Sequence, residues 1–248
     1  MIDLRLGDWR TALADVGEVD ALITDPPYGA RTHAKQKHGR HLSRDGRHYI
    51  TARGLGYAPW SAKDVRTFVS EWAPRLRGWF CAMTSHDLVE AYTQALEAAG
   101  RCVFAPLACV QSGMNVRLAG DGPSNWTVWL VVSRPRGAPF TTWGTLPGAY
   151  YGSAIDTGEQ HRDKSKRAVA GAKPLWLMRA IVRDYSRPGD LICDPCAGGA
   201  TTLLAARMEG RRAIGSEMDP ETFAKAQERI AHMPGERLGQ RALFGDET

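Results

Sequence analysis

The sequence predicts an α/β domain built on a mostly parallel, doubly wound sheet. Short apolar segments typical of strands alternate along the chain with segments whose apolar residues recur at helical spacing. Turns rich in glycine and proline separate these segments, and one of them joins a strand to a helix through small residues. The chain has 248 residues, and we expect residues 1–248 to form a single domain.

The first elements flank a long basic segment. An apolar run predicts a strand over residues 19–24, which ends at two prolines. Residues 29–60 lack periodicity and are predicted to form a loop. Ser61 is expected to begin a helix that extends to about residue 77, because Asp64 completes a capping box and apolar residues follow at helical spacing.

The middle of the chain continues the alternation. Residues 79–83 form an apolar strand, and Ser85 is predicted to cap a helix over residues 86–99 that ends at Gly100. Residues 135–160 are rich in Gly, Pro, Thr and Tyr and are predicted to form a small irregular insert. Apolar runs predict two further strands before this insert, near residues 102–110 and 126–132.

The last third contains the clearest strand–helix alternation. Pro174 suits the first turn of a helix that extends to about residue 185, and Asp219 followed by Pro220 is typical of the start of the last helix. Between them we expect a strand over residues 190–194, a helix over 201–208 and a strand over 212–216.

Bulk composition is that of an ordinary folded protein. Hydrophobic residues make up 43% and charged residues 24% of the chain. The longest apolar run, residues 126–132, is far shorter than the ~18 residues of a membrane span, and the first residues do not have the pattern of a secretory signal. The five cysteines are an odd number, which favours reduced thiols. We therefore expect a cytoplasmic protein with no membrane partner.

Two strand ends are followed by specialised turns. Pro26 and Pro27 fix φ near about −65°, so they hold Asp25 and Tyr28 on a rigid elbow. Small residues over 194–202 let a ligand approach the backbone and the N–H groups at the start of the next helix. A carboxylate at the next strand end, that of Glu217, can accept both hydroxyls of a ribose. Because the carboxyl ends of parallel strands share one edge, a nucleotide-like ligand and a second reactant are expected to meet there.

The positive charge is concentrated in two segments. The net charge is +5, yet residues 31–53 contain seven Arg or Lys and one acid, together with four histidines. Residues 161–173 contain five Arg or Lys and one acid. Such segments favour nucleic acid as a partner, and solvated loops are the alternative. The histidines lack the spacing of a metal site, and the Cys193-x-x-Cys196 pair favours packing over metal or redox chemistry, so no metal is predicted.

These turns resemble the two motifs of the amino-methylating DNA methyltransferases that use S-adenosylmethionine. Asp25-Pro26-Pro27-Tyr28 resembles their catalytic motif, and residues 194–202 resemble their cofactor motif, typically Asp-Pro-Phe-(small)-Gly-Ser-Gly-Thr-Thr. Lys173-Pro174-Leu175 is similar to the segment that opens the cofactor side, and Gly7-Asp8 to the pair near the cofactor adenine. The catalytic motif precedes the cofactor motif, as in the permuted β group. The resemblance implies a Rossmann-like class I methyltransferase fold.

The resemblance also implies a role for each matching residue. Two of the matching residues have a structural alternative to contacting the cofactor. Asp194 can orient its turn, and Asp8 can cap a helical turn over residues 9–13. Cys196 replaces the usual Phe, Gly199 the usual Ser and Ala200 the second Gly, which predicts weaker cofactor binding. The implied catalytic residues are Asp25, Pro26, Pro27 and Tyr28, and the implied cofactor residues are Asp8, Lys173, Asp194, Pro195, Cys196, Ala197, Gly198, Gly199, Ala200, Thr201, Thr202 and Glu217.

The implied substrate is a base flipped out of double-stranded DNA. Arg31, Lys35, Lys37 and Arg40 are the expected phosphate contacts or base readers, and target recognition is assigned to the basic loop and to the insert at about 134–165. Adenine N6 is preferred because the elbow begins with Asp, and cytosine N4 is the alternative. RNA or a protein amide as substrate, and an inactive nucleic-acid-binding module, stay open. A nicotinamide oxidoreductase is disfavoured because no G-x-G-x-x-G follows a strand.

Overall fold

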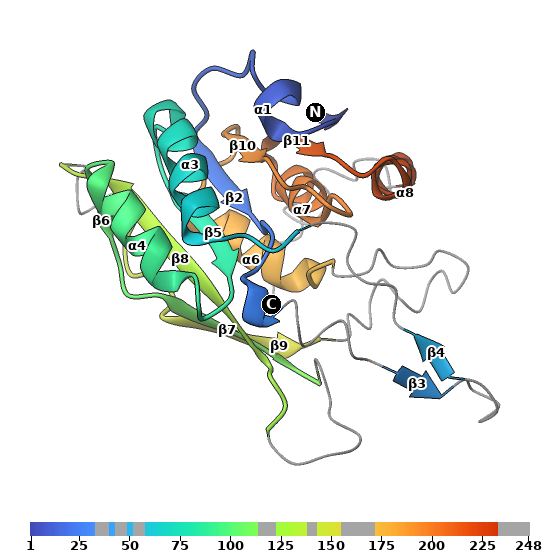
Figure 1. Ribbon diagram of the computed structural model, residues 1–248. Helices are drawn as coiled ribbons and strands as arrows, with labels where there is room; N and C mark the ends of the chain where they lie inside the picture. Colours follow the sequence, from blue (N-terminus) through green and yellow to red (C-terminus); the bar gives the residue numbers. More distant parts are fainter. Residues whose placement is uncertain are drawn as a thin grey trace, which may run out of the picture.

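The computed structural model describes residues 1–32, 40–42, 49–51, 58–113, 123–137, 143–154 and 172–232. Nine strands form one sheet in the order β1-β11-β10-β2-β5-β8-β7-β9, with β6 paired to β8 (Figure 1). The strands are β1 (Ile2–Leu6), β2 (Ala21–Thr24), β5 (Phe80–Thr84), β6 (Arg101–Val103), β7 (Leu107–Ser112), β8 (Thr127–Pro135), β9 (Ala149–Ser153), β10 (Leu191–Asp194) and β11 (Arg212–Glu217).

The sheet has a parallel half and a mixed half. Strands β1, β11, β10, β2 and β5 are parallel neighbours. Strand β8 runs antiparallel to β5, β6 and β7, and the edge strand β9 is again parallel to β7. The prediction of a mostly parallel sheet is confirmed, and the parallel half places five strand carboxyl ends on one edge.

Helices cover both faces of the sheet, giving three layers (Figure 1). Alternation along β2 shows the two faces: Leu22 packs with α1, α3 and α4, whereas Ala21 and Ile23 pack with α6 and α7. All three side chains are buried, as expected for a central parallel strand. The helices are α1 (Trp9–Ala12), α3 (Ala62–Trp72), α4 (Val89–Ala98), α6 (Leu175–Tyr185), α7 (Thr201–Met208) and α8 (Pro220–Ala231).

Local signals explain several helix starts. Ser61 and Asp64 form the predicted capping box at the start of α3, and Asp219 caps α8 by accepting the Thr222 N–H. Helix α3 ends at Trp72, earlier than predicted, and the chain continues as a short 3₁₀ helix (Ala73–Arg75) that contains Pro74. Among the helices that the structure describes, none is long and apolar enough to cross a membrane.

Four predictions of local structure need correction. Ser85 does not cap α4, which begins at Val89 with no side-chain cap. Residues 102–110 split into β6 and β7, because β6 pairs only with the end of β8. The segment predicted as an irregular insert contains β9, which joins the main sheet. The predicted loop 29–60 contains a short antiparallel pair, β3 (Arg40–Leu42) with β4 (Tyr49–Thr51).

Candidate active site

Neighbouring strand ends bring the two specialised turns together. Strands β2 and β10 are parallel neighbours, and the Thr24 hydroxyl at the end of β2 donates a hydrogen bond of 2.7 Å to Asp194 Oδ1 at the end of β10. On the other side of β10, the Gly7 N–H that follows β1 donates to the Glu217 carbonyl at the end of β11 at 2.9 Å. The elbow, the glycine-rich turn, Glu217 and Gly7-Asp8 therefore share one sheet edge, as the sequence predicts.

The Asp25 carboxylate has a partner at each oxygen. The Tyr28 hydroxyl donates to Oδ1 at 2.8 Å, and the Lys173 ammonium lies 2.5 Å from Oδ2. The same ammonium lies over the Tyr28 ring, 5.1 Å from the ring centroid. The resemblance assigns Lys173 to the cofactor side, and the structure places its ammonium against the elbow.

Contacts from Ser85, which directly follows strand β5, and from residue 60 fix the end of the elbow. The Gly29 N–H donates to Ser85 Oγ at 2.9 Å, and the Trp60 N–H donates to the Tyr28 carbonyl at 3.1 Å. A Cβ at Gly29 would lie 2.2 Å from the Asp87 carboxylate, which would have to move to admit a side chain there. These two contacts hold the peptide group between Tyr28 and Gly29, so the backbone directly after the Tyr28 ring is fixed at the sheet edge.

Asp194 is a buried carboxylate that organises its own turn. It accepts hydrogen bonds from the Thr24 hydroxyl, from the Cys196 N–H at 3.1 Å and from Thr202. Burial raises its pKa to about 6, the nearby Asp25 carboxylate acts in the same direction, and the hydrogen bonds oppose the shift. With a side chain only 1% exposed, Asp194 fits the role of orienting the turn better than that of touching a ligand.

The glycine-rich turn is strained at one position. Ala200 adopts a left-handed conformation with φ 61°, which costs an alanine roughly 1–2 kcal/mol relative to the ordinary helical region. The methyl group that replaces the family's second glycine is fully buried. Arg229 of α8 supports the turn by donating to the Gly199 carbonyl and to Thr201 Oγ1. The Ala197 N–H and the Pro195 carbonyl both bond to Ser216 of β11.

Three carboxylates surround Cys196 at this edge. The pKa of the Cys196 thiol is raised well above its usual value by burial and then by Asp194, Glu217 and Asp25. The thiol is therefore neutral, and the negative charge that the carboxylates give this edge is offset at Asp25 by the Lys173 ammonium. Cys196 is partly exposed, whereas Cys193 is buried with a raised pKa. No cluster that could hold a metal occurs in the part of the chain that the structure describes.

Glu217 and Asp8 lie beside each other at the ends of β11 and β1. The Glu217 carboxylate accepts the Asp219 N–H at 2.7 Å and the Gly198 N–H, and burial raises its pKa. Asp8 caps α1 by accepting the Arg10 N–H at 2.8 Å. Glu217 is half-buried and faces the glycine-rich turn, a position from which its carboxylate can reach a ligand held there.

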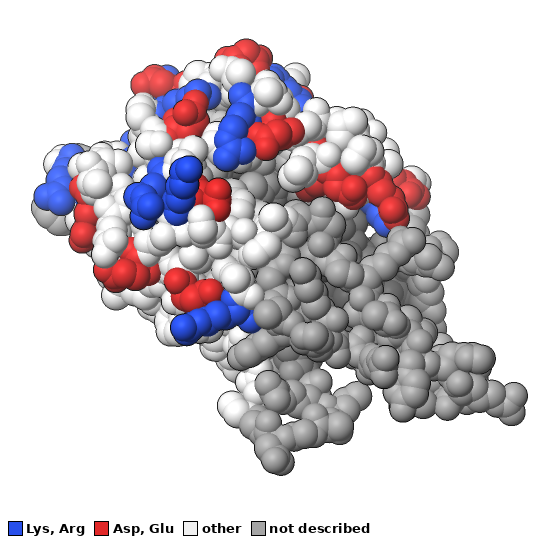
Figure 2. Space-filling model, in the orientation of Figure 1, with Lys and Arg blue, Asp and Glu red and all other residues white. Residues whose placement is uncertain are grey.

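The predicted DNA contacts lie largely outside the described residues. Arg31 is exposed just after the elbow. Lys35 and Lys37 are not described, and Arg40 begins β3 with only its backbone described. On the face shown in Figure 2, basic and acidic side chains are intermixed over most of the described surface and acidic ones gather near α8, so the excess positive charge is not concentrated there.

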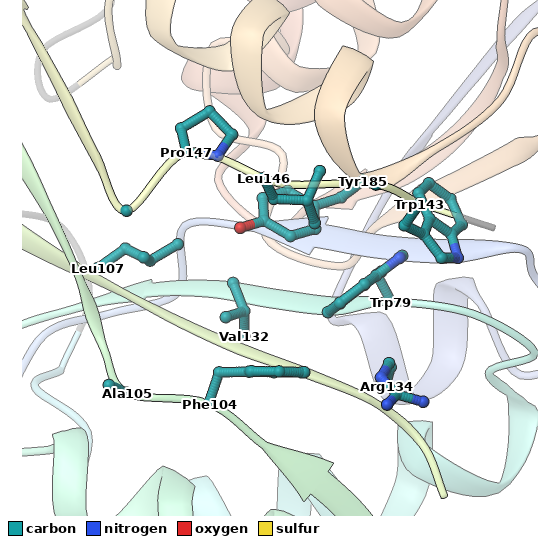
Figure 3. A pocket seen from close by; sticks show the side chains of 12 residues that line it. Trp79, Phe104, Ala105, Leu107, Val132, Arg134, Trp143, Leu146, Pro147 and Tyr185 are labelled. Carbon is teal, nitrogen blue, oxygen red and sulfur yellow. The ribbon is translucent and has the colours of Figure 1, made fainter. Parts of the chain in front are cut away.

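A separate apolar cavity of about 440 Å³ lies at the opposite edge of the sheet (Figure 3). Trp79 precedes β5 and Tyr185 ends α6, so the cavity lies at the amino ends of the parallel strands. None of its lining residues is among the predicted catalytic or cofactor residues, but half of them lie in the segment at about 134–165 to which target recognition is assigned. The lining residues are Trp79, Phe104, Ala105, Leu107, Val132, Arg134, Trp143, Gly144, Leu146, Pro147, Gly148 and Tyr185.

Sequence reasoning missed three supporting residues. Thr24 and Ser85 both lie at strand ends on the edge that holds the site. The order of β10, β2 and β5 in the sheet would have indicated that these two residues support it. Arg229 has no local signal, because it lies one turn from the end of α8 and reaches a turn 30 residues away. The contact of Lys173 with Asp25 joins residues 148 positions apart, which no local pattern encodes.

Comparison with known proteins supports a methyltransferase fold. A family model described as "DNA methylase" matches residues 115–228, a range that includes the glycine-rich turn and Glu217 but not the elbow. In solved structures, M1.HpyAVI in complex with SAM has a TM-score of 0.68 at 20% identity, covering 93% of this chain and 99% of that one. PvuII DNA methyltransferase, titled cytosine-N4-specific, has a TM-score of 0.63 at 17% identity, covering 92% and 86%. The chain therefore has the Rossmann-like class I methyltransferase fold.

Curated relatives match over shorter segments. Type II methyltransferase M.MthZI of Methanothermobacter thermautotrophicus is 41% identical over 59 residues, which is 24% of this chain and 16% of that relative. DNA adenine methyltransferase YhdJ of Escherichia coli strain K12 is 35% identical over 71 residues, which is 27% and 24% respectively. The matched segments span about a third or less of the curated relatives' lengths.

Proposed function

We propose that the protein is a DNA methyltransferase that transfers a methyl group from S-adenosylmethionine to the exocyclic amine of a flipped base. The observation that carries the proposal is the juxtaposition of the Asp25–Tyr28 elbow with the glycine-rich turn, joined by the Thr24–Asp194 hydrogen bond of 2.7 Å. The elbow precedes the turn in the chain, which fits the permuted β-group order. The family model and the methyltransferases among the relatives support the same class.

The described residues fit the cofactor. Glu217, half-buried beside the glycine-rich turn, can accept a ribose diol, and the carboxylates of Asp25 and Asp194 at the same sheet edge would favour a cationic ligand. Gly198 and its neighbours would let the backbone approach the ligand, with Asp8 near the adenine. The cofactor, when bound, supplies an activated methyl group on sulfur.

The elbow would activate the target amine. The lone pair of an exocyclic amine is delocalised into the base, so methylation requires it to localise on nitrogen. The Asp25 carboxylate and the Pro26 carbonyl can each accept one N–H, and both hydrogen bonds strengthen as positive charge develops on the nitrogen. Tyr28 would stack on the base, which contributes about 1–3 kcal/mol toward extruding it from the duplex.

Adenine N6 is the preferred target within this proposal. The Asp-first elbow favours it, and YhdJ is named a DNA adenine methyltransferase. Cytosine N4 is the second candidate, because PvuII methyltransferase is titled cytosine-N4-specific and shares the fold. The proposal includes double-stranded DNA as the partner and a cytoplasmic location. All five cysteines are free thiols, and this supports the cytoplasmic location. Methylation of RNA in place of DNA, or nucleic-acid binding without methyl transfer, would contradict the proposal.

The deciding experiment measures transfer of labelled methyl groups from S-adenosylmethionine to mixed-sequence duplex DNA, followed by nucleoside mass spectrometry. We expect N6-methyladenine with the wild type and a loss of at least about 100-fold with Asp25→Ala, because the charged acceptor of the developing ammonium is removed. Asp15→Ala, which removes an exposed carboxylate paired with Arg5, is the matched control and should retain activity. Unlabelled DNA together with intact cofactor binding would refute a DNA substrate, and N4-methylcytosine would refute only the choice of base.

A further inference from the structure

The Lys173 ammonium occupies the place that the proposed target amine needs. It lies 2.5 Å from Asp25 Oδ2 and 5.1 Å from the centroid of the Tyr28 ring. These two groups are the acceptor and the stacking surface assigned above to the flipped base. The Lys173 and Asp25 side chains are 11% and 22% exposed, so their ion pair is shielded from water more than a typical surface pair.

Other contacts already orient Asp25. The Tyr28 hydroxyl donates to the second oxygen, Oδ1, and the two prolines restrict the backbone on the other side. The Gly29 N–H anchors the end of the elbow on Ser85. Because the carboxylate is oriented without Lys173, the ammonium fills an acceptor position that the elbow would otherwise present to a ligand.

We propose that Lys173 is a specificity-determining residue whose ammonium stands in for the target amine until a correctly placed base replaces it. The proposal rests on the function proposed above. The exchange replaces a salt bridge between two charged groups with a hydrogen bond from a neutral amine to the Asp25 carboxylate, which is weaker, so it costs free energy. Stacking on Tyr28 and contacts to a correct base supply that free energy. In the transition state positive charge develops on the amine, so Asp25 again faces a cation. A misplaced base does not complete the exchange, so Lys173 disfavours methylation at incorrect sites.

The test compares three variants on defined DNA. Lys173→Met removes the charge and keeps an unbranched side chain, Lys173→Arg keeps a cation, and Lys225→Met is the matched control, because Lys225 is a surface lysine of α8 paired with Glu221. Sequencing of methylated genomic DNA from cells expressing the wild type identifies the target site. Single-turnover methylation is then measured on duplexes with that site and with each single-base mismatch, alongside calorimetric S-adenosylmethionine affinity and thermal unfolding.

We expect Lys173→Met to reduce the ratio of target to mismatch rates by about tenfold, because the exchange no longer has to displace a cation. The ratio should fall because the rates on mismatched duplexes rise, whereas the rate on the target changes less, since a correct base already displaces the cation before the transition state. The cofactor affinity of Lys173→Met should be unchanged. Lys173→Arg and Lys225→Met should keep at least the wild-type ratio.

Two results would overturn the inference while leaving the proposed function intact. An equal loss of rate on target and mismatched DNA would show that Lys173 supports the methyl transfer directly. A cofactor affinity weakened about tenfold or more in Lys173→Met would show a cofactor residue, as the motif resemblance implies. Absence of DNA methylation by the wild type would instead overturn the proposed function, and this inference with it.

Discussion

At the scale of single residues, Asp194 joins the two strand ends of the site through an ionisable group placed in the protein interior. A carboxylate that is 1% exposed is costly to ionise, and its three hydrogen bonds offset only part of that cost, so its pKa rises to about 6. A carboxyl whose pKa is raised on folding favours the folded state while it is protonated. Its contribution is therefore complete below the unfolded value of 3.8 and is lost as the pH rises through about 6.

Asp194→Asn should remove this pH dependence. The amide keeps an oxygen to accept from Thr24 and from the Cys196 N–H, and it cannot ionise. Between pH 4 and pH 8 the wild type should lose on the order of 3 kcal/mol of unfolding free energy relative to the variant, the equivalent of a shift of about two pKa units. Urea unfolding of both proteins across this range is the measurement. Parallel profiles would show that Asp194 ionises as it does in water.

At the scale of elements, the glycine-rich turn rests on the strand beside it. Gly215 of β11 is paired with Asp194 of β10, and a Cβ at Gly215 would lie 2.6 Å from the Asp194 carbonyl oxygen and 3.3 Å from the Ala197 Cβ. The backbone atom cannot move without displacing the end of β10. The close approach of β11 thus determines where the turn lies.

Gly215→Ala should therefore perturb both stability and cofactor binding. Overpacking at such a site costs about 1–3 kcal/mol, and the displaced turn should weaken S-adenosylmethionine binding. Gly17→Ala is the matched control: a Cβ at Gly17 meets nothing within 4 Å, so its effect should stay within about 0.5 kcal/mol. Urea unfolding and calorimetric titration separate the two effects. Normal stability and normal cofactor affinity in Gly215→Ala would contradict the account.

Local signals were sufficient for some elements and not for others. Helix α7 has the predicted bounds and α8 has the predicted Asp219 cap, because small-residue turns and capping side chains act within a few residues. Strand β9 escaped prediction, because its place depends on distant partners: β7, and Trp176 of α6, whose ring lies where a Cβ at Gly152 would be. In the site, both turns and Glu217 were predicted from strand ends. The pairing of Lys173 with Asp25 was not, because it depends on how α6 packs against β2.

At the scale of the whole molecule, the charge is divided between an acidic body and two basic segments. Residues 31–53 carry a net +6 and residues 161–173 a net +4, so the remainder of the chain carries −5. On the face shown in Figure 2, acidic side chains gather around α8. The first basic segment begins just after the elbow and the second ends at Lys173 beside Asp25, so both connect to the candidate site. An acidic body repels DNA phosphates and leaves these segments as the expected contacts.

Salt dependence can test this division of charge. Replacing Lys35 and Lys37 with Gln should reduce the slope of log affinity for duplex DNA against log salt by up to about 1.8, since each phosphate contact contributes about 0.9. Arg77→Gln with Arg212→Gln is the matched control: it removes the same charge from exposed positions near the amino ends of β5 and β11, on the opposite edge of the sheet. If the slope depends on net charge alone, both double variants will lower it equally. If the basic segment after the elbow contacts the phosphates, only the Lys35/Lys37 variant will lower the slope. Its cofactor affinity should be unchanged, because neither lysine is among the residues assigned to the cofactor.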